Sequence, residues 1–434
     1  MKRLLSVLVA VFFMTGMVVA QTGNTSTVTQ EGDGDQATVN QTGNLNYMEY
    51  SVKGDENIFT ASQDNSMKET QEGNWMHVDQ YSWQQNQNIG NVITATQMGD
   101  ENDLDALLKG DRNNITFYQD GARNQIKGFS PAPDESFTEE PFRLNSDDSY
   151  VSITQIGQDN LMRGDIQGNN QHVDVYQENG QPDDNVSEVF IRASWGNPAQ
   201  QTVDIDQVGQ NYSHAQIHGD GNAVTHNQYG NQEGSERGRN TAVTWIIDGE
   251  GNTSSIEQEG QNDAGYGFNY QNVTAPGDDP YYGAWAGAWH KIMGDNNTAI
   301  THQDGNDNKG VIIQSSDGNT ARQVQDAWNG IAGEDDPNGE ADNNQSWIYQ
   351  HTGANDAYTF QFGDNNSARI IQNGDGNIAI GDQGIWDQER PAATGYAPAH
   401  GYGNTMNVSQ TGNSNWSHVI QNGNGNTANV TQQQ

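Results

Sequence analysis

The side chains that recur at a fixed spacing in this sequence are the amides of glutamine and asparagine. Residues 372–383 and 421–432 both fit Gln-x-Gly-x-Gly-Asn-x-Ala-x-x-x-Gln, in which the second Gln follows the first after 11 residues. A side-chain amide has two N–H donors and a carbonyl acceptor. Identical amides stacked at the spacing of β-strands can therefore hydrogen-bond to one another, as they do in cross-β ladders. The chemistry that this spacing indicates is structural.

Residue types that carry out catalysis or bind metals lack the spacings that such chemistry needs. The sequence has no Cys, its 10 His are scattered, and His-Glu-x-x-His, Gly-x-Ser-x-Gly and phosphate-loop motifs are missing. Acidic glycine-rich turns such as residues 31–35 lack the nine-residue Gly-Gly-x-Gly-x-Asp repeat of calcium-binding β-rolls. We therefore expect no enzyme activity, no catalytic residue, no cofactor and no specific metal site, with weak calcium binding at the acidic surface left open.

The 11-residue spacing continues along most of the chain, which identifies an internal repeat. Apolar residues replace the glutamine in some units, for example at Val52, Leu108, Ile166 and Ile292. The amides that keep the phase, and that we expect to form the ladders, are Gln30, Gln41, Gln97, Asn102, Asn113, Gln119, Gln155, Gln177, Gln303, Asn308, Gln314, Asn319, Gln325, Gln350, Asn355, Gln361, Asn366, Gln372, Asn377, Gln383, Gln410, Asn415, Gln421, Asn426 and Gln432.

The elements that must position these amides are short strands. Between Asn113 and Gln119, apolar residues alternate with polar ones, so Ile115, Phe117 and Gln119 share one face. A period of two is typical of a half-buried strand. From each Gln to the next Asn is five residues, an odd number, so the pleat must break once, and glycine supplies the positive φ for this bend. Two units then close a coil of 22 residues that places Gln97 over Gln119, Gln350 over Gln372 and Gln410 over Gln432. The sequence predicts an all-β fold, a cross-β solenoid of 11-residue half-repeats.

The composition agrees with a solenoid that has a partly polar interior. Hydrophobic residues make up 32% of the 434 residues, mean hydropathy is −0.89, and the net charge is −39. This charge argues against binding to nucleic acid or to anionic membranes, because both require a basic surface. A disordered Gln/Asn-rich tract is the alternative. Disorder would require neither the 11-residue spacing nor the alternation of apolar and polar residues, so these two patterns favour the solenoid.

The domain organisation follows from where the 11-residue repeat begins and where it is interrupted. Lys2 and Arg3 precede an apolar run that ends at Ala20, which predicts a cleaved secretion signal over residues 1–20. No later run is long enough to insert into a membrane. We expect residues 21–434 to form one solenoid with loops inserted between coils near 125–149, 183–200, 231–240, 264–290, 328–343 and 386–403. The aromatic stretch 281–289 is either a contact surface or a loop that folds over the flank.

The repeated unit resembles the curlin repeat, from which curli fibres are built. Members of this family are exported through an outer-membrane channel and polymerise into functional amyloid in the biofilm matrix, with a nucleating subunit. The resemblance covers most of residues 21–432 and implies a fibre subunit or its surface nucleator, located outside the cell. It assigns the motif Gln and Asn positions as ladder residues, and its partners are further copies of the chain, a nucleator and the secretion channel.

A solenoid ends in strand edges, so we expect identical chains to add end to end. The acidic charge opposes assembly, and lower pH, salt or divalent cations should speed it. Two other classes stay open: a monomeric or nucleating surface β-solenoid, acting as an adhesin or ice binder, and a polysaccharide-degrading β-helix. Outward positions of mixed chemistry disfavour ice binding, and the sequence has no clustered carboxylate cleft.

Overall fold

The structure is a computed structural model that describes residues 23–433 with internal gaps. The gaps are 54, 67–72, 82–89, 110–112, 129–141, 146–148, 168–170, 180–184, 193–200, 219–220, 230–238, 248, 262–286, 307, 327–343, 384–402 and 422–423. The expected signal peptide lies outside the described residues. Within the described ranges the chain forms strands and turns, and none of it is an apolar helix long enough to cross a bilayer.

Strands form where apolar and polar residues alternate. In β8 (Asn114–Ala122), Ile115, Phe117 and Gln119 are buried while Thr116 and Tyr118 are half-buried. The same alternation of buried and more exposed positions recurs in β25 (Asp356–Phe362) and β29 (Trp416–Gln421). Each strand therefore has one face in the interior and one face outside.

The strands form two parallel sheets that we call sheet A and sheet B. Sheet A contains β1 (Thr25–Glu31), β3 (Tyr47–Lys53), β5 (Trp75–Tyr81), β7 (Asp103–Lys109), β9 (Gln125–Gly128), β10 (Phe142–Asn145), β12 (Leu161–Gln167), β14 (Val186–Arg192), β16 (Gln210–His218), β18 (Arg239–Ile247), β20 (Gly287–Met293), β22 (Lys309–Gln314), β24 (Gln345–Gln350), β26 (Ser367–Asn373), β28 (Thr405–Thr411) and β30 (Thr427–Gln433). Sheet B contains β2 (Gln36–Thr42), β4 (Ile58–Asp64), β6 (Val92–Asp100), β8, β11 (Tyr150–Gln158), β13 (Gln171–Glu178), β15 (Gln201–Val208), β17 (Ala223–Tyr229), β19 (Thr253–Gln261), β21 (Thr298–Asn306), β23 (Thr320–Asp326), β25, β27 (Ile378–Gln383) and β29.

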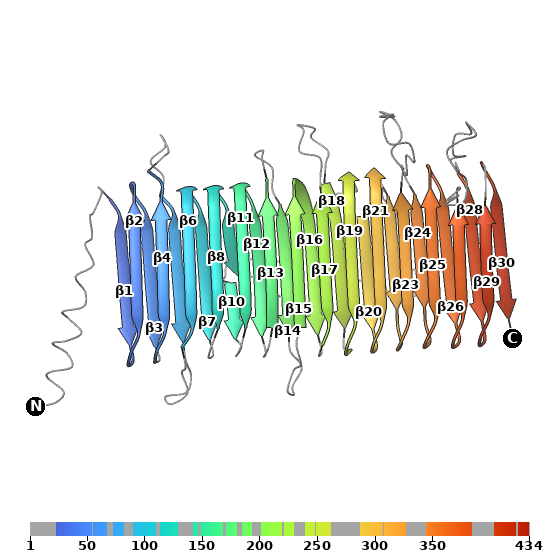
Figure 1. The fold of residues 1–434 in the computed structure, drawn as a ribbon, viewed down its shortest axis with the longest axis horizontal. Coiled ribbons are helices and arrows are strands. Elements are labelled where there is room, and N and C mark those ends of the chain that lie inside the picture. Colours follow the sequence, from blue (N-terminus) through green and yellow to red (C-terminus); the bar gives the residue numbers. More distant parts are fainter. Residues whose placement is uncertain are drawn as a thin grey trace, which may run out of the picture.

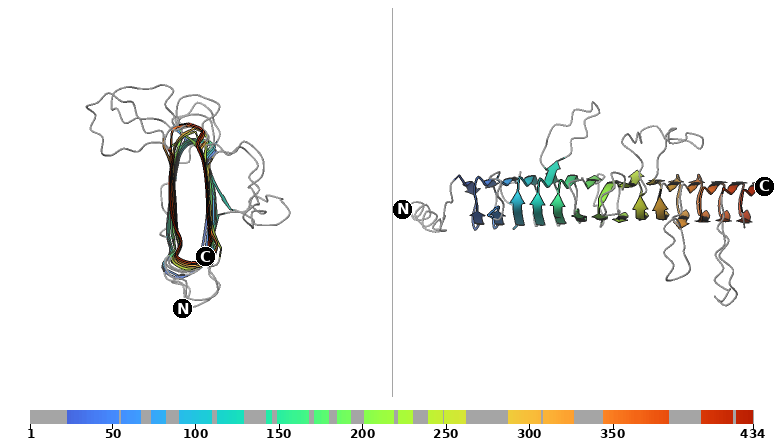
Figure 2. Two further views of the ribbon diagram at one scale, coloured as in Figure 1. Left: turned by 90° about the vertical axis from the view of Figure 1, so that its right-hand side faces the viewer. Right: turned by 90° about the horizontal axis from the view of Figure 1, so that it is seen from above.

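The chain winds between the two sheets as a solenoid. Successive strands alternate between the sheets, except that β9 and β10 both belong to sheet A, and each strand pairs in parallel with the strand one coil later. The register places Gln97 beside Gln119, Gln350 beside Gln372 and Gln410 beside Gln432. Figure 1 shows the resulting elongated stack, with β1 at one end and β30 at the other, and Figure 2 shows its flattened cross-section. The predicted fold class is confirmed.

The main apolar core fills the space between the sheets. Its largest fully buried members include Tyr50, Phe59 and Phe117, and the rings of Tyr50 and Phe59 stack with centroids 4.0 Å apart. A second apolar cluster lies on the outward positions of sheet A and contains Val243, Trp289, Val311, Ile313 and Tyr349. Trp289 comes from the aromatic stretch seen in the sequence. Residues 281–286 of that stretch lie outside the described residues.

Several predicted loop boundaries were wrong because strands occupy parts of the ranges. β14 lies inside 183–200, β18 begins at Arg239, and β20 begins at Gly287. Within 125–149, β9 and β10 both pair with β7 and β12, so they share one level of sheet A. This insertion interrupts a strand and does not enter at a turn. The one-solenoid organisation of residues 21–434 stays a prediction.

The turns contain the pleat break that the repeat arithmetic requires. In most of the described turns the residue before the inward Asn has a positive φ, even where it is not glycine, as at Leu45, Ala354 and Ser414, with φ of 53–58°. Gly121 has a different reason to be glycine. Its φ is +127°, and an added Cβ would lie 1.8 Å from the carbonyl oxygen of Gly157 on the next coil. Close approach of stacked turns therefore demands glycine there.

Candidate functional site: the amide ladders and the end strands

One unbroken glutamine ladder runs through all the described strands of sheet B. In each step the Nε2 of one Gln donates to the Oε1 of the Gln on the next strand, over 2.7–3.0 Å. The members from Gln63 to Gln421 are buried. The ladder consists of Gln41, Gln63, Gln97, Gln119, Gln155, Gln177, Gln207, Gln228, Gln258, Gln303, Gln325, Gln361, Gln383 and Gln421.

The same amides also tie the two sheets together. The Nε2 of Gln361 donates to the backbone oxygen of Gln345 over 2.9 Å, and the Nε2 of Gln372 donates to that of Asp356 over 3.0 Å. A backbone carbonyl can only accept, which fixes which end of the amide is nitrogen. Most inner glutamines therefore use one N–H along the ladder and the other across the interior. The sequence predicted only the first of these bonds.

Sheet A carries a glutamine ladder over its C-terminal part alone. Gln314, Gln350, Gln372, Gln410 and Gln432 are linked by Nε2-to-Oε1 bonds of 2.8–3.0 Å. The positions before them in the same register include the buried apolar residues Val52, Ile217, Ile246 and Ile292.

The change from apolar side chains to amides leaves one group without a partner. Gln314 follows Ile292 in register, and its buried Oε1 accepts no hydrogen bond. Gln30 pairs in register with Val52. The expectation that Gln30 joins a glutamine ladder was therefore wrong, and Gln314 bonds to a ladder amide on one side only, because the neighbouring positions are apolar.

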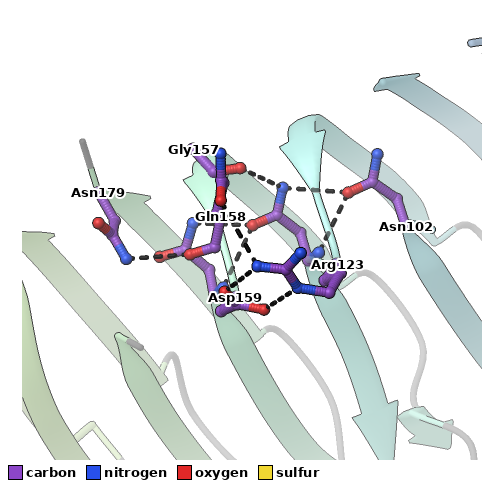
Figure 3. Close-up of polar contacts among 8 residues, drawn as sticks. Asn102, Arg123, Gly157, Gln158, Asp159 and Asn179 are labelled. Atoms are coloured by element: carbon purple, nitrogen blue, oxygen red, sulfur yellow. Dashed lines mark hydrogen bonds and ion pairs between the residues drawn. The ribbon is translucent and has the colours of Figure 1, made fainter. Parts of the chain in front are cut away.

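Asparagine ladders line the turns and bond in a different way. The Oδ1 of Asn102 accepts from the backbone N and the Nδ2 of Asn124, each over 3.1 Å. Figure 3 shows this turn, where Arg123 also pairs with Asp159 on the next coil at 2.5 Å. The predicted residues Asn308, Asn319, Asn355, Asn366, Asn377, Asn415 and Asn426 take part in the same pattern.

The asparagine ladder of sheet B is interrupted where its sequence departs from the motif. The Oδ1 and Nδ2 of Asn113 make no hydrogen bond, so the expectation that the side chain of Asn113 joins a ladder was wrong. Ser149, which carries no amide, occupies the next position. Gln171 and Gln201 occupy the two positions after that, and the ladder resumes between Asn222 and Asn252.

The hydrogen bonds give the solenoid a direction. Every Gln-to-Gln side-chain bond above runs from an Nε2 to the next Gln toward the C-terminus, whereas asparagine Oδ1 atoms accept from the next coil. The two ends therefore differ. At the C-terminal end, Gln421 and Gln432 each donate one N–H across the interior, to the backbone oxygens of Thr405 and Trp416. By the pattern of the ladder, the second N–H of each would donate to a Gln on a following coil. At the other end, Gln41 has its Oε1 as the free end of the ladder.

The strands at both ends have one edge without a neighbouring strand among the described residues. β1 and β2 lie at one end, and β29 and β30 lie at the other. The inward apolar side chains there, namely Val28, Ala37, Val39, Ala428 and Val430, pack on the core but are only partly buried. Parallel strand edges with unsatisfied backbone groups are templates for another strand.

A chain of buried polar side chains replaces part of the apolar core between β16 and β21. The ring of His226 contacts Ser213 and Thr244 at 2.5 and 2.8 Å, and Thr244 bonds to Ser254 at 2.7 Å. Next along the chain, the ring of His290 contacts Ser254 and Thr301 at 2.8 and 2.7 Å.

Burial keeps both of these rings neutral. It lowers the pKa of His226 well below its ordinary value and lowers the pKa of His290 to about 3. A neutral imidazole can both donate and accept, so each ring bridges two hydroxyl groups. These His had looked scattered in the sequence.

The outward face of sheet B carries an acidic cluster made of Asp174, Asp204 and Asp206. Partial burial is the main cause that raises the pKa of each carboxyl group, and repulsion within the cluster adds to it. The register places Asp174 beside Asp204. No group of three or more His, Asp and Glu in the described ranges has the geometry of a metal site.

Some ladder members could not be found from the 11-residue phase alone. Gln207 and Gln228 are 21 residues apart, and Gln177 and Gln207 are 30 apart, because turns are shortened or lengthened there. The signal that finds them is local. Each Gln closes a run in which inward Val or Ile alternates with polar residues, as in Val203-Asp204-Ile205-Asp206-Gln207.

Comparison with protein families bears on the C-terminal coils. Residues 401–433, which include β28, β29 and β30, match the family model of the curlin associated repeat. Residues 401–433 therefore carry a curlin associated repeat. This repeat belongs to a family of extracellular structural fibre subunits and not of enzymes. No curated protein matched the chain.

Proposed function

We propose that this protein is a secreted structural subunit that polymerises end to end into curli-like functional amyloid fibres. These fibres would belong to the cell surface and the biofilm matrix and would support adhesion. The observation that carries the proposal is that, among the described residues, the strands at both ends of a solenoid with directional amide ladders have one open edge and only partly buried inward apolar side chains. A second copy would satisfy the backbone edges, extend the ladders and bury the apolar side chains at the ends.

The directional ladders favour head-to-tail addition. The C-terminal end has amide N–H donors at Gln421 and Gln432, and the N-terminal end has an acceptor at Gln41. A head-to-tail contact that does not close into a ring generates a filament. A nucleating subunit and an outer-membrane secretion channel are the further partners that we propose, on the strength of the repeat family.

The test uses the purified chain of residues 21–434 under assembly conditions, followed by electron microscopy and an amyloid dye. We expect unbranched filaments. Val430→Asp places a carboxylate at an inward position of the last strand, where the next copy would bury it. Burial of an unpaired charge costs several kcal/mol, so growth should fall by about 100-fold or more. Thr431→Asp, on the outward face of the same strand, should change growth by less than about threefold.

A wild-type protein that remains monomeric for days and binds no dye would contradict the proposal and leave the monomeric adhesin as the better account. Equal growth of the Val430→Asp and Thr431→Asp variants would also contradict it, because the inward face of β30 would then not be a contact between copies.

A further inference from the structure

The solenoid ends on a half-coil. Across the described residues, sheet A has fifteen levels, since β9 and β10 share one, and sheet B has fourteen. The first strand, β1, and the last strand, β30, both belong to sheet A. The described chain thus makes 29 half-coils, an odd number. This property constrains how a second copy can continue the stack.

A copy added in the same orientation cannot fill every level. Its β1 would lie on β30 in sheet A, and its β2 would follow β29 in sheet B. Because the sheets alternate along the chain, one level of sheet B would be missing between β29 and that β2. The backbone groups of β29 would then have no partner inside the fibre, and unpaired buried backbone groups are rare in proteins.

A copy turned by half a turn about the fibre axis fills every level. Its β1 then lies on β29, its β2 lies on β30, and the alternation of sheets continues without a gap. The register set by the glutamine columns would place Gln30 of the added copy beside Gln421, and Gln41 beside Gln432.

The inward side chains at the first of these two contacts are chemically identical. Inward positions follow from the burial alternation and from the register of the end strands with their neighbours. The inward residues of β29 and of β1 form the same series, Ser-Val-Gln, and they are Ser417, Val419 and Gln421 in β29 and Ser26, Val28 and Gln30 in β1.

The second contact shows the same identity with a different series. The inward residues of β30 and of β2 both read Ala-Val-Gln, and they are Ala428, Val430 and Gln432 in β30 and Ala37, Val39 and Gln41 in β2. Neighbouring strands within the chain need not match in this way: β27 places Ala379 and Gly381 beside Ser417 and Val419 of β29.

We propose that successive copies in the fibre are related by a half-turn about its axis, with β1 of each copy on β29 of the one before and β2 on β30. This inference rests on the proposed end-to-end assembly and specifies its contact. Matching Val over Val and Gln over Gln continues the core and both ladders at constant width. The occupant of each end is a second copy of this chain.

Cysteine pairs test the contact, because the sequence has no Cys. The half-turn places outward Ile420 beside Thr29 of the next copy, at the ~4.8 Å separation of paired strands, which a disulfide can bridge. The variant Ile420→Cys/Thr29→Cys should therefore form covalent ladders of many copies when its fibres are oxidised. The matched control Thr431→Cys/Thr29→Cys pairs the same position with the other sheet and should give less than about a tenth of that cross-linking. Electron microscopy before oxidation establishes that both variants form fibres.

The reverse outcome, cross-linking through residue 431 and none through residue 420, would overturn the half-turn in favour of copies in one orientation. Fibres without cross-links in either variant would overturn it in favour of another contact and leave the proposed function standing. The absence of any fibre would overturn the proposed function, and this inference with it.

Discussion

The substitution Gln361→Ala tests how much one amide of the sheet B ladder contributes. Gln361 is fully buried, accepts from Gln325 over 2.9 Å and donates to Gln383 over 2.8 Å. Alanine leaves the Oε1 of Gln383 and one of the two N–H groups of Gln325 without a partner inside the core, while the other N–H of Gln325 keeps its bond to the backbone oxygen of Lys309. One unsatisfied buried group costs about 1–3 kcal/mol, and the lost side-chain volume adds a cavity term. We expect the variant to be destabilised by about 3–5 kcal/mol.

Hydrogen exchange of the soluble protein, followed by mass spectrometry, measures this effect locally. A solenoid contacts only its neighbouring coils, so the loss should be concentrated in β23, β25 and β27. At about 1.4 kcal/mol per tenfold, exchange there should speed up by roughly 10²- to 4 × 10³-fold.

The control Gln36→Ala removes an exposed, outward glutamine of β2 and should change stability by less than about 0.5 kcal/mol. If Gln361→Ala and Gln36→Ala exchange at the same rate in β25, the ladder does not stabilise the fold and the reasoning is refuted.

Three other predictions follow from the interior and the surface. Ile292→Gln should be less destabilising than Ile246→Gln by about 1–3 kcal/mol in guanidinium unfolding, because only the first gives the orphaned Oε1 of Gln314 a donor; equal losses would contradict this. The folded-state pKa of His290 lies below its unfolded value, so stability should fall as pH drops below about 6.5, and wild type should lose about 2 kcal/mol more than His290→Gln between pH 7 and pH 5. If the stability of the two proteins falls by the same amount between pH 7 and pH 5, the burial of His290 is not the cause of the loss. Finally, salt or calcium should shorten the assembly lag at pH 8 by screening the net charge of −39, and unchanged lag times would show that repulsion does not limit assembly.

Most of the fold could be predicted from the sequence, because one 11-residue pattern determines the strands, the turns and the register together. Alternation placed Ile115 and Phe117 inside, and the odd Gln-to-Asn spacing required the positive φ that the turns show. Insertion boundaries were less predictable, because a strand such as β14 lacks the motif Gln. The inward position that holds Gln in other strands is apolar in β14. A search for repeated amides therefore misses this strand.

The sequence did not show how the ladders are distributed between the sheets. Val52, Leu108, Ile166 and Ile292 looked like scattered exceptions, but their register puts them all in one column of sheet A. The polar chain through His226 and His290 was hidden for a similar reason. Its members come from consecutive strands on opposite sheets, and only the closed coil brings their side chains within hydrogen-bonding distance.

The central claim is that the two ends of this solenoid continue one another through the same ladders that hold its interior. Cryo-electron microscopy of fibres grown from residues 21–434 tests it most directly. We expect a fibre one solenoid wide, with levels about 4.8 Å apart, a copy about every 70 Å from its 29 half-coils, and glutamine density unbroken across the junctions. Fibres in which the copies lie side by side, or in which both glutamine columns stop at each junction, would contradict the claim.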